Sequence, residues 1–112
     1  MEAPSAYDIT QMLQKSEAFC AYQERCSLEV VEKLNRLGAN AEQTEHILAK
    51  LRANNFLNDA RFAAAYATGK LRIKHWGVNK IKQGLQLKRI APELIKEELI
   101  QMYDQENYFG IL

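Results

Sequence analysis

The apolar residues of this 112-residue chain recur at steps of three and four, and no stretch alternates apolar and polar residues long enough to predict a strand. The pattern therefore predicts an all-α protein. Its first helix is expected to follow a capping box formed by Ser5 and Asp8. Ser27 and Asn40 are expected to cap the second and third helices, and Gly38 to end the second in a left-handed conformation.

Three further helices are predicted in the second half of the chain. Asn58 is expected to cap a fourth helix, which Gly77 separates from a fifth. Pro92 suits the first turn of a sixth helix, and Asp104 is expected to cap a seventh. The apolar stripe of the fourth helix is predicted to consist of Phe62, Tyr66, Gly69, Ile73 and Trp76.

The helical pattern occurs twice. A shift of 51 residues superimposes the second and third predicted helices on the fifth and sixth, so that Val30 meets Ile81 and Leu34 meets Leu85. One three-helix unit buries little surface, and stacked copies are therefore expected to form an elongated helical array. The predicted repeats are 1–55 and 56–104, with 105–112 as the start of a possible truncated third repeat.

Positive charge is concentrated in one part of the chain. The segment 60–92 carries eight Lys and Arg residues and no Asp or Glu, although the formal net charge of the whole chain is only +1. Such a strip is typical of proteins that bind polyanions or an acidic protein surface, and its alternative is a solvated helical face. The candidate partner-binding or DNA-binding residues are Lys70, Arg72, Lys74, Lys80, Lys82, Lys88 and Arg89.

The helix dipole accounts for the position of some of these cations and not of others. Lys88 and Arg89 lie at the predicted C-terminus of the fifth helix, where cations are favoured. Lys80 and Lys82 lie near its N-terminus, where anions are favoured, so structure alone does not account for them. Trp76 lies at the bend between the fourth and fifth helices. It is interpreted either as an aromatic anchor between them or as a platform on which a nucleic-acid base stacks.

No catalytic motif is evident, so an enzyme is not predicted. The sequence shows no nucleophile with its base, metal cluster or phosphate-binding loop, and no cofactor is expected. The first residues lack the pattern of a signal peptide, and no window has eighteen consecutive apolar residues, which favours the cytosol. Cys20 and Cys26 are accordingly expected as buried thiols without a disulfide or a metal.

Three segments in order resemble the RecX family of RecA regulators. They are Glu29-Val-Val-Glu-Lys-Leu34, Phe56-Leu-Asn-Asp-Ala-Arg-Phe-Ala63 and Trp76-Gly-Val-Asn-Lys-Ile81. The chain departs from the family pattern at Cys26, where many members have Ser, and at Arg89, where Gly is frequent. The motif residues to which the resemblance assigns a structural role are Asp59, Arg61, Phe62, Trp76, Gly77 and Ile81.

The resemblance implies an all-α protein of tandem three-helix repeats, cytoplasmic, non-catalytic and expected to be monomeric. Its implied partners are the RecA filament and the single- or double-stranded DNA within it, so that it restrains RecA in recombination and the SOS response. A helix-turn-helix module that binds naked DNA through the fifth and sixth helices is the alternative. Glu93, Glu97 and Glu98 on the sixth helix would repel phosphates and count against it. A protein scaffold with a solvated basic face is the third hypothesis.

Overall fold

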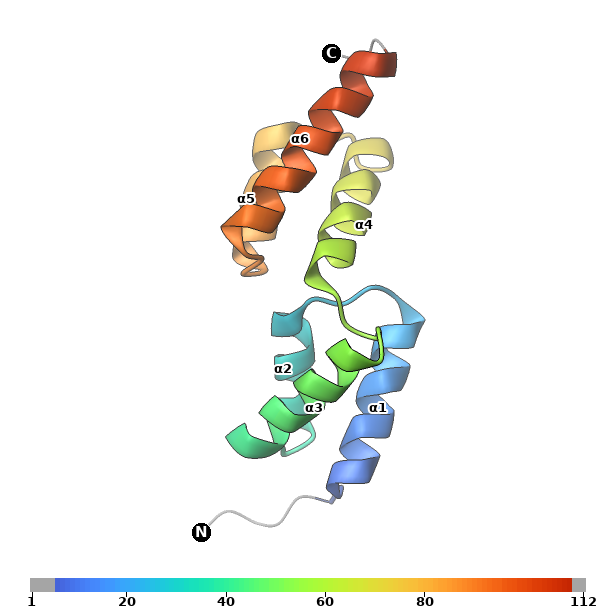
Figure 1. Cartoon of the computed structure of the whole chain (residues 1–112), viewed down its shortest axis with the longest axis vertical. Helices are drawn as coiled ribbons and strands as arrows, with labels where there is room; N and C mark the ends of the chain where they lie inside the picture. The colour runs from blue at the N-terminus through green and yellow to red at the C-terminus, as the bar shows by residue number, and fades with distance from the viewer. Residues whose placement is uncertain (1–5, 110–112) are drawn as a thin grey trace. The chain divides into compact units, whose positions relative to one another are not determined.

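The computed structural model describes the backbone of residues 6–109 and the side chains of residues 6–104. Within that range the chain forms six α-helices and no strand, which confirms the all-helical prediction (Figure 1). Residues 1–58 and 59–112 form two compact units. The first unit contains α1 (Ile9–Tyr22), α2 (Ser27–Arg36) and α3 (Ala41–Ala53), and the second contains α4 (Asp59–Arg72), α5 (Val78–Leu87) and α6 (Pro92–Phe109). In each unit every helix packs against the other two.

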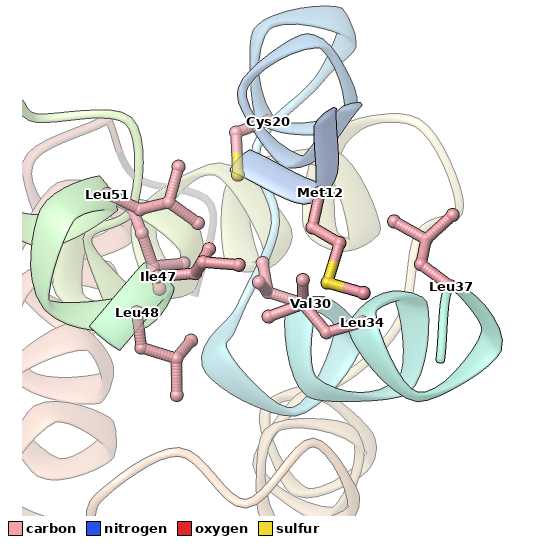
Figure 2. Packing of buried hydrophobic residues seen from close by; sticks show 9 residues of the cluster. Met12, Cys20, Val30, Leu34, Leu37, Ile47, Leu48 and Leu51 are labelled. Carbon is pink, nitrogen blue, oxygen red and sulfur yellow. The ribbon is translucent and has the colours of Figure 1, made fainter. Parts of the chain in front are cut away.

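The core of the first unit is formed by the apolar stripes of its three helices. Met12 and Cys20 come from α1, and Figure 2 shows them facing side chains from α2 and α3. Both cysteines are buried thiols, as the sequence predicts. The buried cluster comprises Met12, Cys20, Val30, Leu34, Leu37, Ile47, Leu48, Leu51 and Leu57.

The second unit repeats the first two helices of the first with the same lengths. α1 and α4 each have fourteen residues, and α2 and α5 each have ten. The connection between these two helices covers 23–26 in the first unit and 73–77 in the second, so it is one residue longer in the second unit. The prediction of tandem three-helix repeats is confirmed.

Two of the three helix starts in the first unit differ from the sequence prediction. Asp8 caps α1 through a capping box with Gln11, and Ser5 lies outside the described residues. α2 is capped by Cys26, whose N–H donates to a carboxylate oxygen of Glu29 at 3.0 Å, while Ser27 is already the first helical residue. The start of α3 is as predicted, because Asn40 and Gln43 form a reciprocal capping box.

The fourth helix ends earlier than its apolar stripe predicts. α4 stops at Arg72, and Ile73 is 76% exposed instead of packed. The chain reverses at His75, which has a φ of 58°, and the N–H of Trp76 donates to the carbonyl oxygen of Lys70 at 2.9 Å. The extra residue of this connection is thus accommodated by a left-handed turn that brings Trp76 back beside α4.

The sixth helix, in contrast, is longer than predicted. α6 runs without interruption through Asp104, so this residue lies within the helix and does not cap a seventh one. Residues 105–109 of the predicted third repeat continue the same helix, and 110–112 lie outside the described residues.

The turns that end α2 and α5 have the same geometry. Gly38 has a φ of 87°, and Arg89, its equivalent in the second unit, has a φ of 57°. In both turns the following N–H reaches back five residues: Ala39 donates to Leu34 at 3.0 Å and Ile90 to Leu85 at 3.1 Å. Arg89 therefore adopts the left-handed conformation in which glycine is favoured, at a non-glycine position.

The core position of Ile47 changes chemistry between the units. Ile47 of α3 is fully buried, and its equivalent in the second unit is Glu98 of α6, which is 9% exposed. Burial raises the pKa of the Glu98 carboxyl above its ordinary value. The sequence groups Glu98 with Glu93 and Glu97 as carboxylates that would repel phosphates. The structure corrects this for Glu98, because it shares its helix side with the buried Ile95 and Met102.

We expect Arg89→Gly to stabilise the second unit. Glycine removes the steric cost of a left-handed residue but adds unfolded-state entropy, so the net gain should be about 0.5–1 kcal/mol. Arg89→Ala is the matched control, because it removes the charge and keeps the Cβ. Urea unfolding of the three proteins measures the effect. A midpoint for Arg89→Gly no higher than that for Arg89→Ala would contradict the strain at this turn.

The raised pKa of Glu98 predicts a pH-dependent stability. The folded state holds this proton more tightly than the unfolded state, so the free energy of unfolding should fall as the pH rises from about 4.5 through the raised value. Glu98→Gln should therefore be more stable than the wild type at neutral pH, with the difference shrinking in acid. Thermal melts across pH measure this, with exposed Glu97→Gln as the control. Equal responses of the two variants would contradict it.

Candidate partner-binding site

Trp76 is the centre of a group of aromatic and cationic side chains between α4 and α5. Its ring lies at 72° to that of Tyr66, with 6.4 Å between the centroids. The Nζ atoms of Lys70 and Lys80 lie over the Trp76 ring, 4.6 and 4.4 Å from its centroid, and Lys70 is also 5.3 Å from the Tyr66 centroid. We call Tyr66, Lys70, Trp76 and Lys80 the cationic aromatic cluster. Attraction between ammonium groups and ring faces holds the two lysines at a defined place.

Tyr66 is positioned by a close approach to α5. Its ring packs against Phe62 with 5.8 Å between centroids, and its side chain crosses Gly84. A Cβ at position 84 would lie 2.9 Å from Cζ of Tyr66 and closer still to its hydroxyl oxygen. Burial raises the pKa of Tyr66, and the positive charge of Lys88 opposes this by lowering it. Lys88 therefore acts electrostatically on the same tyrosine that supports the cluster.

The structure separates the two lysines that the helix dipole leaves unexplained. Lys80 contacts Trp76, whereas Lys82 lines an apolar groove of about 850 Å³ in the second unit. Positions two apart on a helix point about 160° apart, which explains the separation. The groove is lined by Val78, Lys82, Gln86, Ile90, Pro92, Ile95, Lys96, Leu99, Ile100, Tyr103 and Asp104.

The remaining candidate cations lie at the ends of α4 and α5. Arg72 is the last residue of α4, Lys74 is in the connection, and Arg89 follows α5; all three are exposed. Lys88 is half-buried at the C-cap of α5. The structure thus brings Lys70 and Lys80 together around one aromatic ring, with Lys88 acting on the adjoining tyrosine.

The residues of the family motif have mainly structural surroundings. Phe62 and Ile81 are buried in the second unit, and Asp59 is the first residue of α4. Arg61 is exposed on the first turn of α4. Gly77 caps α5 with a φ of −73°, and a Cβ there would meet no atom within 4 Å, so neither backbone nor space requires glycine.

The first unit has a related contact in which the cation comes from the connection and the aromatic ring comes from the first helix. The Arg25 guanidinium lies 3.8 Å from the centroid of the Phe19 ring, and its Nε donates to the Phe19 carbonyl oxygen at 2.9 Å. Lys33 lies over the same ring at 5.6 Å. Arg25 occupies the position in the first unit that Trp76 occupies in the second. In both units, cation and ring contacts therefore join the first helix to the connection that follows it.

The close contact between helices at Gly84 was not predicted from the sequence, although the sequence contains a signal for it. A glycine inside the predicted fifth helix costs stability unless something approaches its backbone closely, and Tyr66 does so. No group of three or more metal-ligating side chains occurs among the described residues. None of the described helices has the length and apolar character needed to cross a membrane.

Gly84→Ala should destabilise the second unit. The added methyl group clashes with the Tyr66 ring and hydroxyl, and overpacking of this kind costs about 1–3 kcal/mol. Tyr66→Phe in the same protein removes the closest atom and should recover part of the loss. Gly69→Ala is the control, since a Cβ there meets nothing within 4 Å. Thermal unfolding measures all four proteins. If Gly84→Ala proved as stable as Gly69→Ala, Tyr66 would not lie over Gly84.

Comparisons with known proteins agree on one family. Residues 58–99 match the family described as "RecX, second three-helix domain". The chain is 30% identical over 94 residues to "Regulatory protein RecX" of Lactobacillus johnsonii, covering 84% of this chain and 35% of that protein. It is also 30% identical over 97 residues to the protein of the same name from Prosthecochloris aestuarii, covering 87% of this chain and 64% of that one.

A solved structure supports the same assignment. The "Crystal structure of regulatory protein RecX" matches with a TM-score of 0.71 and 28% identity, covering 82% of this chain and 48% of the other. The chain spans from about a third to less than two thirds of the length of these relatives. Sequence and fold agree over both units, and together these comparisons support a RecX family protein.

Proposed function

We propose that this chain is a non-catalytic regulator that binds a RecA filament and the DNA it holds, and so restrains RecA activity. The observation that carries the proposal is the cationic aromatic cluster, which concentrates two lysines on one tryptophan within the acid-free segment 60–92. The relatives are named regulatory proteins, and RecA as the partner is what the resemblance to the RecX family implies. Cytoplasmic location belongs to the same proposal.

The geometry favours a fixed electrostatic contact over base stacking. Trp76 is half-buried, packs against Tyr66 and already has two ammonium groups over its ring. A stacked base would have to compete with these contacts. The ring therefore holds Lys70 and Lys80 in position, and the ammonium groups are the atoms that would contact phosphate or carboxylate oxygens. Binding through them should weaken as salt rises.

The charge on α6 counts against a helix-turn-helix that reads naked duplex. Glu93 and Glu97 are exposed on this helix, where a recognition helix would face phosphates. The cations lie instead at the ends of α4 and α5. A surface of this kind contacts an anionic partner without inserting a helix into the major groove.

Lys70→Glu/Lys80→Glu should abolish inhibition of RecA strand exchange and of its DNA-dependent ATPase. The matched control is Lys15→Glu/Lys50→Glu in the first unit, which changes the net charge equally; Lys15 also lies over an aromatic ring, that of Tyr7, at 4.8 Å. The control should retain inhibition. Circular dichroism verifies that both variants keep their helices. Equal loss in both variants would show that total charge, and not the cluster, carries the effect.

Binding measurements then separate the filament from naked DNA. Trp76 is the sole tryptophan of the chain, so its fluorescence reports on the cluster directly. We expect it to change on addition of RecA filaments far more than on addition of the same DNA alone. Tight binding to naked duplex, with a logarithmic salt slope near −0.9 per neutralised phosphate, would favour the helix-turn-helix alternative. If the wild type neither inhibits RecA nor binds its filament, the proposal is wrong.

A further inference from the structure

The apolar groove between α5 and α6 differs in chemistry from the equivalent place in the described part of the first unit. In the second unit Val78 and Tyr103 border the groove. Their equivalents in the first unit are Ser27 and Arg52, and there the Arg52 guanidinium donates to the Ser27 hydroxyl at 3.2 Å. The same place on the repeat is thus bridged by a polar contact in one unit and lined by apolar side chains in the other.

The groove leaves large apolar side chains in contact with water. Ile100 is 52% exposed and Tyr103 is 59% exposed, and both lie on the groove side of α6. Ile100 stands where the first unit has Ala49. Apolar side chains gathered along a groove are typical of an interaction surface.

The charges along the groove are arranged so that they complement a second copy of themselves. Lys96, Ile100 and Asp104 are spaced by four residues and so share one face of α6. When two such helices lie antiparallel with Ile100 at the centre, Lys96 of each faces Asp104 of the other. The apolar residue then meets its own copy on the two-fold axis. Isologous contacts are self-complementary in this way.

We propose that this groove is an interface between two copies of the chain, with α6 of each copy lying in the groove of the other. The resulting core is a four-helix arrangement of α5, α6 and their copies, in which Ile100 and Tyr103 are covered. Two Lys96–Asp104 pairs set the antiparallel orientation. This departs from the monomer that the family resemblance led us to expect. It does not use the cationic aromatic cluster and does not depend on the proposed function.

A nucleic acid fits this groove less well than a second copy does. Lys82 and Lys96 would attract phosphates and Asp104 would repel them, but the apolar wall would remain uncovered by a charged backbone. An unrelated helix would need an apolar stripe with an acid at one end and a base at the other, which is the pattern that α6 itself carries.

Sedimentation velocity of the purified chain over a concentration series tests the dimer. The wild type should shift from monomer to dimer as its concentration rises. Lys96→Asp and Asp104→Lys each place like charges opposite one another and should give monomer at the same concentrations. The double exchange Lys96→Asp/Asp104→Lys restores opposite charges and should restore the dimer. A wild type that remains monomeric throughout, or a dimer that all three variants leave unchanged, would overturn the proposal.

Disulfide cross-linking tests the same interface if a charge variant fails to fold. Ile100→Cys places a thiol on the proposed two-fold axis, and with oxidised glutathione the two copies should form a disulfide, seen as a band of twice the mass. Ile73→Cys, on an exposed residue outside the groove, is the control and should not cross-link at the same rate. The native Cys20 and Cys26 are buried and give the background. Equal cross-linking of the two variants would overturn the interface. Neither experiment contains RecA or DNA, so failure of the dimer and failure of the proposed function remain distinguishable.

Discussion

Each unit of this protein depends on one backbone hydrogen bond that reaches back five residues across the turn between its second and third helices. It joins Ala39 to Leu34 in the first unit and Ile90 to Leu85 in the second. The bond requires a left-handed residue immediately before the donor, and its geometry sets the direction in which the third helix leaves the turn. In the second unit it sets α6 against α5, and Ile90 and Ile95, which are both buried, line the apolar groove between the two helices. The core and the groove therefore depend on the same turn.

The common backbone carries different chemistry in the two units. Ile47 fills a core position that Glu98 occupies in the second unit, and Arg25 stands where the second unit has Trp76. These exchanges leave the helices in place because the shared apolar positions, such as Leu34 and Leu85, remain fully buried. The spacing of the shared apolar residues thus specifies the repeat. The remaining positions can differ between the units and can therefore form a binding site in one of them. The second unit, with its cationic aromatic cluster and its groove, carries both surfaces that we propose bind a partner.

The repeat could be predicted from the sequence because the helical spacing of its buried residues can be recognised in one sequence alone. The start of α3 could be predicted for a similar reason, since Asn40 and Gln43 form a local pair. Prediction failed at the local caps that start α1 and α2, and it failed again where the decisive contact joins segments further apart in the chain. Trp76 continues the spacing of α4, yet a reversal at His75 ends the helix and leaves Ile73 exposed. Likewise, nothing near Gly84 in the sequence shows that Tyr66 crosses it, because the two come from different helices.

The candidate site, too, could be predicted only in part from the sequence. Eight cations in an acid-free segment predict an anionic partner, but the charge count does not say which cations act together. The structure places Lys80 on Trp76 and Lys82 among apolar side chains, so two neighbours in sequence face different surroundings. The exposed carboxylates of Glu93 and Glu97 on α6 give the second unit sites of opposite charge. Under the proposed function, an anionic partner is attracted to one part of the unit and repelled from another, which orients it as well as binding it.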